Sequence, residues 1–260
     1  MLSTPRSKGP RSGPEGAASR LAAIIGCGVQ GAALARELAG EGARTRADLR
    51  RPATLARLPR AAQASVLFDP ARNVPLAAAA AIAAEAKRRL VFDLGDGRPR
   101  RCEVAVVGSI RRQAPFIKDI DLLVTIPAEL EGRLERVLAA AALRPPRAGD
   151  RITLADTYAA GARRRSLILQ AAAGGRGRNY RTDLFVTTEA ERPYALYHYT
   201  GPRSFNIRGR AHVKRRGWLL NQYGLFNAAS RRRIPGSGVR TERELAALIG
   251  VTYQPPARRV

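Results

Sequence analysis

The chain has 260 residues and a formal net charge of +25, from 46 Lys and Arg against 21 Asp and Glu. Apolar residues make up 45% of it, which excludes a disordered chain, and the excess charge predicts a polyanionic partner, either nucleic acid or an acidic membrane surface. No apolar run approaches the roughly 18 residues of a membrane span. Two Cys and two His are too few for a disulfide framework or a structural zinc site.

Residues 1–19 are rich in Ser, Pro, Gly and basic side chains and lack apolar periodicity. We expect them to form a disordered basic tail. No apolar segment follows the initiator Met as it would in a signal peptide, so the sequence indicates an intracellular protein that is not secreted.

The next segment, Ala22–Ile25 followed by Gly26-Cys27-Gly28-Val29-Gln30-Gly31, admits two interpretations. One is the glycine-rich turn of a dinucleotide-binding unit, which would make the chain an NAD-binding protein. The other is a helix-hairpin-helix, in which Gly26 and Gly28 lie between two helices and offer backbone N–H groups to a DNA phosphate. The hairpin is favoured, because no clear second strand and no alternation of strands and helices follows Arg44.

An apolar run, Val104–Val107, predicts a strand that leads into a Gly108-Ser109 turn, and Asp119-Ile120-Asp121 opens a second strand ten residues later. Side chains alternate across a strand, so Asp119 and Asp121 point the same way. Carboxylates are hard ligands for Mg²⁺, and a Gly-Ser turn can present N–H groups to phosphates. The pair of motifs is typical of a nucleotidyl transferase.

A third carboxylate comes from Tyr180–Val186, which reads as a strand with a single acid, Asp183. Two metal ions about 3.5–4 Å apart need more anionic oxygens than one Asp-x-Asp motif supplies. The alternative is that Asp183 only caps a strand or pairs with an arginine. Together with the two upstream motifs, Asp183 is interpreted as catalytic.

The last sixty residues, Gly201–Val260, hold 13 Lys and Arg against 2 Glu. A general preference for arginine does not explain why acids are so scarce there. A surface that binds a nucleic-acid backbone does explain this scarcity, because acidic side chains would repel the phosphates.

Further motifs follow in a fixed order. With the aspartates they resemble the family X DNA polymerases, the group that includes DNA polymerase beta. The matching segments are Gly108–Arg112, Asp119–Asp121, Arg181–Asp183, Tyr199–Gly201, Ser204–Asn206 with Arg210, Gly217–Phe226, Thr241–Glu244 and Tyr253–Pro256.

The resemblance implies an α+β fold, a nucleotidyltransferase-type palm with a mixed β-sheet between two smaller parts. A helical DNA-binding subdomain with the helix-hairpin-helix is expected over residues 20–89, the catalytic palm over 90–188 and a C-terminal nucleotide-selecting subdomain over 189–260. About twenty residues before the hairpin are too few for the amino-terminal lyase domain of many relatives, so that domain is expected to be lacking.

By the same resemblance the chain is expected to be a DNA-directed DNA polymerase, adding dNTPs to a primer 3′-OH by a two-metal mechanism in short-gap DNA repair. Two Mg²⁺ ions, with Mn²⁺ as a substitute, would be its cofactors. Asp119, Asp121 and Asp183 would be both the catalytic residues and the metal ligands. The expected partners are gapped or primed DNA and dNTPs, with no membrane, and the chain is expected to be a monomer in a DNA-containing compartment: a nucleus, a prokaryotic cytoplasm or a viral factory.

The resemblance also assigns binding residues. The nucleotide-binding set is Gly108, Ser109, Arg112, Tyr199, Gly201 and Asn206. The DNA-binding set is Gly26, Gly28, Arg181 and Arg210.

Five positions depart from the family pattern: Gln113, Ile117, Lys118, His198 and Pro202. Lys118 stands beside the first aspartate where the family has a small residue, so it would either add a phosphate contact or crowd the metal site. His198 replaces a tyrosine, which puts sugar discrimination in question.

The main alternative is a template-independent terminal or poly(A)-type nucleotidyltransferase, which would share the Gly-Ser turn and the aspartates without needing the hairpin. A DNA-binding protein with a decayed palm is a second alternative. The three intact aspartates argue against it.

Overall fold

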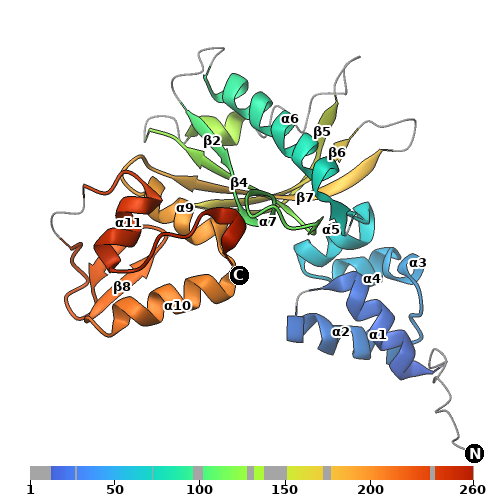
Figure 1. Cartoon of the computed structure of the whole chain (residues 1–260). Helices are drawn as coiled ribbons and strands as arrows, with labels where there is room; N and C mark the ends of the chain where they lie inside the picture. The colour runs from blue at the N-terminus through green and yellow to red at the C-terminus, as the bar shows by residue number, and fades with distance from the viewer. Residues whose placement is uncertain are drawn as a thin grey trace, which may run out of the picture. The chain divides into compact units, whose positions relative to one another are not determined.

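The computed structural model describes residues 13–26, 28–71, 73–95, 102–127, 132–137, 151–171, 177–234 and 238–259. The chain divides into two compact units, Met1–Pro70 and Ala71–Val260 (Figure 1).

The first unit is helical. Its helices are α1 (Pro14–Ile25), α2 (Gly28–Gly40), α3 (Arg46–Leu49), α4 (Pro52–Ala56) and α5 (Arg60–Phe68). Their apolar faces form a small common core that includes Leu21, Ile25, Leu38 and Leu49.

The glycine-rich segment joins two helices, so the dinucleotide-binding interpretation is wrong and the helical hairpin is confirmed. Ala22–Ile25 lies inside α1 and not in a strand. Gly26 and Gly28 have φ angles of +70° and +60°, in the region that favours glycine. Cys27 between them lies outside the described residues.

Helix α1 begins at Pro14, so the expectation of a tail up to residue 19 is wrong for residues 14–19. Pro14 is well placed at the first helical position, where no N–H is needed. Ala17, Ala18, Leu21 and Ile25 repeat at helical spacing and are buried. Because two members of this stripe are small alanines among polar residues, its helical periodicity was not recognised in the sequence. Residues 1–12 lie outside the described part of the chain.

The second unit is built on a five-stranded sheet. Its strands are β2 (Glu103–Val106), β4 (Ile120–Thr125), β5 (Ile152–Gly161), β6 (Arg164–Ala171) and β7 (Arg178–Thr187). Their order is β2-β4-β7-β6-β5, and β4 and β7 run parallel while their other neighbours are antiparallel. The sheet is therefore mixed, as predicted. Two short strands, β1 (Val74–Pro75) and β3 (Phe116–Ile117), pair beside it.

Helix α6 (Leu76–Gly95) covers one face of this sheet. Its buried stripe of small residues, Ala79, Ala83 and Ala86, lets the helix approach the strands closely and shares a core with Leu122 and Leu184. The boundary expected at residue 89 is corrected by this packing: the unit begins at Ala71, and α6 belongs to the palm.

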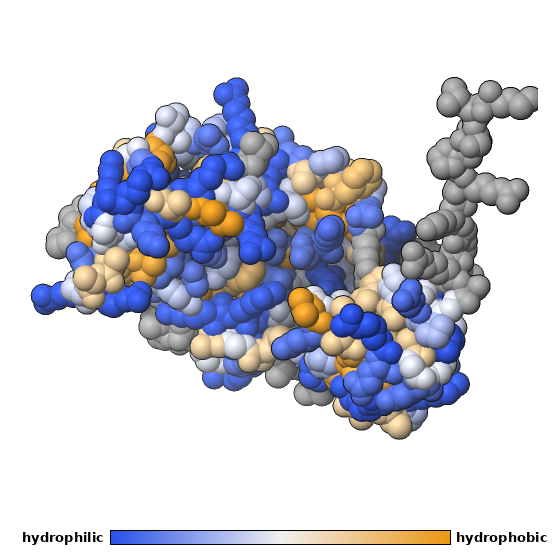
Figure 2. Space-filling model, turned by 90° about the horizontal axis from the view of Figure 1, so that it is seen from below, coloured by the Kyte–Doolittle hydropathy of each residue, from blue (hydrophilic) through white to orange (hydrophobic). Residues whose placement is uncertain are grey.

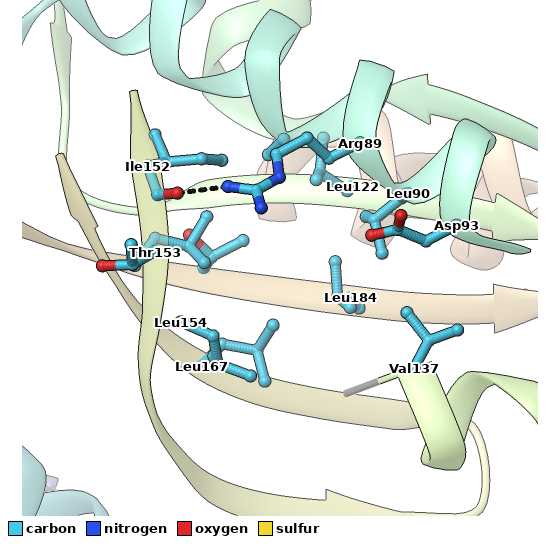
Figure 3. Close-up of a pocket in the computed structure, with 13 residues that line it drawn as sticks. Arg89, Leu90, Asp93, Leu122, Val137, Ile152, Thr153, Leu154, Leu167 and Leu184 are labelled. Carbon is cyan, nitrogen blue, oxygen red and sulfur yellow. Dashed lines mark hydrogen bonds between the residues drawn. The ribbon is translucent and has the colours of Figure 1, made fainter. Parts of the chain in front are cut away.

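Figure 3 looks into the layer between α6 and the strands. Arg89 points from the helix toward β5 and donates a hydrogen bond to the backbone carbonyl of Ile152. Leu122, Leu154 and Leu184 project from the strands beneath it and line a small apolar cavity with it.

The opposite face of the sheet meets the C-terminal part. This part contains α9 (Arg192–Thr200), α10 (Arg203–Lys214), the hairpin β8 (Trp218–Asn221) and β9 (Gly224–Asn227), α11 (Glu242–Ile249) and a 3-10 turn, Pro256–Arg258. Ala195 and Leu196 of α9 pack on Val107 and Leu123 of the palm. A separate core, with Tyr194, Phe205 and Leu245 among its members, holds the C-terminal part together.

A buried charged network ties the palm to the C-terminal part. The short helix α7 (Gly108–Arg111) carries Arg111, which donates to the hydroxyl of Thr200 and to Glu242. Glu242 also forms an ion pair of 2.8 Å with Arg259, whose side chain is 1% exposed. None of the described helices is both long enough and apolar enough to cross a lipid bilayer.

Candidate active site

The three aspartates meet on the face of the sheet that the C-terminal part borders. Asp121 in β4 and Asp183 in β7 are direct neighbours across a parallel strand pair, so their side chains share a face. Asp119, two residues before Asp121, lies directly before the first residue of this strand. The structure therefore brings together the three carboxylates that the sequence singled out.

Two of the three carboxyl groups have raised pKa values, from burial first and then from the neighbouring carboxylates. Burial, and then the charge of Asp183, raises the pKa of Asp119 above its ordinary value. Burial and the carboxylates of Asp119 and Asp183 raise the pKa of Asp121 to about 8. The raised pKa values of these two neighbouring acids fit the binding of divalent cations, whose charge would relieve the repulsion.

Gly108 begins α7 directly against Asp121. Its φ is +61°, and a Cβ built on it would lie 1.9 Å from Oδ2 of Asp121. Both the backbone conformation and the space therefore require glycine. The expected Gly-Ser turn is the first turn of this short helix.

An open cavity of about 470 Å³ adjoins Asp119 and Asp121, within the usual size of a small-molecule site. All six predicted nucleotide-binding residues line it: Gly108, Ser109, Arg112, Tyr199, Gly201 and Asn206.

Two buried polar atoms at this cavity lack a partner within the described residues: the hydroxyl oxygen of Ser109 and the amide oxygen of Asn206. Buried polar groups are normally hydrogen bonded, so both atoms are suited to a ligand. The amide nitrogen of Asn206 donates to the His198 carbonyl at 2.6 Å, which fixes the side chain. Arg112 donates to the carbonyl of Thr200, and burial lowers the pKa of its guanidinium although the nearby aspartates oppose this.

Tyr199 stacks on Phe185 of β7, with ring centroids 3.9 Å apart and planes 15° apart. Burial raises the pKa of Tyr199 to about 12, so its ring is neutral. The stack fixes this wall of the cavity against the strand that carries Asp183.

The carboxylate of Asp183 is engaged by two residues that sequence reasoning missed. Ser166 of β6 donates to Oδ1 at 2.5 Å, and Arg164 donates to Oδ2 at 2.7 Å. Among the described residues, no three His, Cys, Asp or Glu side chains already stand in the arrangement of a metal site. Ser166 is paired with Asp183 in the antiparallel register of β6 on β7. This register has to be known before either residue can be assigned to the site.

The predicted DNA-binding residues fall in different places. Arg181 lies beside Asp119 and lowers the pKa of that carboxyl, although burial and Asp183 outweigh it. Arg210 lines the cavity one turn after Asn206 and donates to its carbonyl at 3.2 Å. Gly26 and Gly28 belong to the first unit, whereas every residue that lines this cavity belongs to the second. Their DNA contacts stay predictions.

Basic side chains extend from the cavity along α10. Arg203, Arg208, Arg210 and Lys214 are all exposed on this helix. Figure 2 shows that hydrophilic residues cover most of the surface seen from below, the side on which α10 lies in Figure 1. The exposed basic side chains of α10 are suited to a phosphate backbone.

A mixed sheet that presents three aspartates beside a nucleotide-sized cavity, with a C-terminal part closing one side, defines the class of nucleotidyltransferases with a polymerase palm. A structural comparison gives the same fold. The chain is similar to polymerase beta of Leishmania infantum in a ternary P/T complex, with a TM-score of 0.73, 19% identity, and coverage of 95% of this chain and 99% of the other.

Sequence comparison supplies the family. The DNA polymerase beta thumb model matches residues 195–260. The repair DNA polymerase X of African swine fever virus (isolate Pig/Kenya/KEN-50/1950) is 34% identical over 157 residues, which cover 60% of this chain and 81% of the viral one. The DNA polymerase/3′-5′ exonuclease PolX of Bacillus subtilis is 29% identical over 159 residues, 58% of this chain and 23% of the bacterial one.

The chain belongs to the family X DNA polymerases. It is a DNA-binding transferase, a DNA-directed DNA polymerase of DNA repair, as the sequence predicted. Family X polymerases use divalent metal ions, and carboxylate oxygens such as those of the three aspartates are the ligands that hard divalent cations prefer.

Proposed function

We propose that this polymerase fills short gaps in duplex DNA, adding dNTPs to a primer 3′-OH under the direction of the template base. The observation that carries the proposal is the convergence of Asp119, Asp121 and Asp183 beside a cavity lined by every predicted nucleotide-binding residue. A charge of +25 suits the DNA substrate, and the protein would act, as a monomer, wherever that DNA is held.

The three aspartates would hold two Mg²⁺ ions, for which Mn²⁺ could substitute. Divalent ions bound there would lower the pKa of the primer hydroxyl and neutralise charge on the triphosphate. The raised pKa of Asp121 and the 1.9 Å approach that a Gly108 Cβ would make to its carboxylate support this assignment, since both mark a crowded acidic site.

The remaining lining residues would bind and orient the nucleotide. The hydroxyl of Ser109, which has no hydrogen-bond partner among the described residues, would donate to a phosphate oxygen, and Arg112 would add a charge-assisted contact to the triphosphate. Tyr199 and Gly201 would lie against the sugar and base, and Asn206 would use its free amide oxygen on the minor-groove side of the new pair.

Four further residues would contact the DNA. Gly26 and Gly28 would expose backbone N–H groups of the hairpin to a phosphate. Arg181 would orient a carboxylate or the primer phosphate, and Arg210 would reach the template base from the same helix face as Asn206.

Extension of a primer in a one-nucleotide gap, with each dNTP opposite each template base, tests the proposal. We expect incorporation that follows the template base, requires Mg²⁺ or Mn²⁺ and disappears in Asp183→Ala while duplex binding is retained. Incorporation that ignores the template base would instead identify a terminal transferase. Undiminished extension by Asp183→Ala would remove the assignment of the acidic site.

A further inference from the structure

Arg164 and Asp183 form a two-point ion pair at the centre of the acidic site. Nη2 of Arg164 donates to Oδ2 at 2.7 Å, and Nε lies 3.3 Å from Oδ1. The Asp183 side chain is 11% exposed and that of Arg164 is 59% exposed. A largely exposed arginine side chain therefore covers a carboxylate that is nearly buried.

The same guanidinium has a second partner within reach. It lies 5.6 Å from the ring centre of Phe185, the residue that stacks on Tyr199 in the wall of the cavity. Arginine can stay on an aromatic face after it gives up a carboxylate. Arg164 can therefore leave Asp183 without losing every favourable contact.

We propose that Arg164 is a positioning residue which holds Asp183 when no metal is bound and competes with divalent cations for its carboxylate. The inference rests on the proposed function, because it takes Asp183 to be a metal ligand. Arg164 thereby makes metal binding at this polymerase weaker than the three aspartates alone would allow.

Two physical effects act in the same direction. The guanidinium fork occupies lone pairs on both carboxylate oxygens, the same oxygens that a cation would need. Its positive charge also repels an approaching cation in a partly buried site, where screening by water is reduced. A bound divalent ion and the two-point ion pair are therefore alternatives.

Ser166 keeps the carboxylate in place when Arg164 leaves. Its hydroxyl donates to Oδ1 of Asp183 at 2.5 Å, and it is 3% exposed. A single neutral donor leaves lone pairs available on both oxygens and adds no charge. Loss of Arg164 should thus leave Asp183 oriented and free to coordinate.

The test is Mn²⁺ binding to the full chain by isothermal titration calorimetry, without DNA or nucleotide. In Arg164→Gln we expect Mn²⁺ to bind on the order of threefold to tenfold more tightly than in wild type, since a partly exposed ion pair and one repelling charge are removed. In Arg164→Lys, which keeps the charge but loses the fork, the affinity should lie between the two.

The chain offers a matched control in Arg88 and Glu85 on α6. This pair is also joined at two points, by contacts of 2.7 and 3.0 Å, and its side chains are 69% and 15% exposed. Arg88→Gln removes the same charge at similar exposure on the other side of the sheet. It should leave Mn²⁺ affinity unchanged, and thermal unfolding of each variant confirms that it is folded.

Asp183→Asn separates the possible failures. If this variant weakens Mn²⁺ binding but Arg164→Gln binds no more tightly than wild type, competition by Arg164 is overturned and the proposed function stands. An affinity of Arg164→Lys equal to that of wild type would overturn the role of the fork. Mn²⁺ binding that Asp183→Asn leaves unchanged overturns the metal assignment of Asp183 and the inference with it.

Discussion

Gly108 faces Asp121 so closely that a Cβ on the glycine would lie 1.9 Å from the carboxylate oxygen Oδ2. The two residues belong to adjacent elements, the first turn of α7 and strand β4, whose contact positions the aspartate. The methyl group that Gly108→Ala adds would therefore push the Asp121 carboxylate out of its position in the acidic site.

We predict that Gly108→Ala lowers single-turnover extension in a one-nucleotide gap by at least about 10²-fold, because Asp121 must move by an ångström or more. Gly217→Ala is the matched control. Gly217 has a similar φ of +70°, but no atom of the described residues lies within 4 Å of a Cβ built on it, so this change adds backbone strain without a clash. Equal losses in both variants would show that strain alone, and not displacement of Asp121, lowers the rate.

The buried pair of Glu242 and Arg259 gives a prediction for stability. Their side chains are 5% and 1% exposed, and Arg111 is hydrogen bonded to the same glutamate. Glu242→Ala would leave two guanidinium groups without their acid, and removing one partner of a buried pair costs about 3–5 kcal/mol. We expect a loss of that size in the free energy of unfolding, measured with urea.

Glu103→Ala is the comparison for this stability change. Glu103 pairs with Arg192 at the surface, with side chains 55% and 22% exposed, and loss of an exposed pair costs about 1 kcal/mol or less. Similar costs for the two substitutions would contradict the special role of the Glu242 pair in joining palm and C-terminal part.

The stack of Phe185 on Tyr199 leads to a prediction about sugar selection. Phe185→Leu keeps an apolar side chain but removes a stacked ring, an interaction of about 0.5–1.5 kcal/mol. Tyr199 should become less restricted, and the ratio of kcat/KM for dNTP over rNTP should fall by about two- to tenfold. Phe92→Leu on α6, at a residue that is 63% exposed, should leave the ratio unchanged.

The sequence alone was sufficient to single out the three aspartates that the structure brings together, because carboxylates in these motifs are recognisable as metal ligands. Alternation along one strand placed Asp119 and Asp121 on the same face, and the order of the motifs added Asp183 to them. The mixed sheet and the helical hairpin were predicted correctly too. The hairpin follows from a local glycine pattern, whereas the mixed sheet was expected from the resemblance to the family.

Other features depended on contacts between distant segments. Ser166 and Arg164 reach Asp183 only through the pairing of β6 with β7, and nothing in their local sequence distinguishes them from other polar residues. Helix α6 was assigned to the wrong part, because a run of alanines does not reveal which surface its small-residue stripe contacts. The start of α1 was missed for a similar reason, since Ala17 and Ala18 are small members of a buried stripe.

His198, which departs from the family pattern, gives the last prediction. Burial, and then the charge of Arg210, lowers the pKa of His198 below its ordinary value of 6.5. The unfolded chain therefore binds more protons than the folded chain as pH falls below 6.5, and the stability present above that pH is progressively lost. His198→Gln cannot titrate, so its free energy of unfolding should fall less than that of wild type between pH 7 and pH 5. Parallel curves for the two proteins in urea titrations would show that His198 is not held neutral by its surroundings.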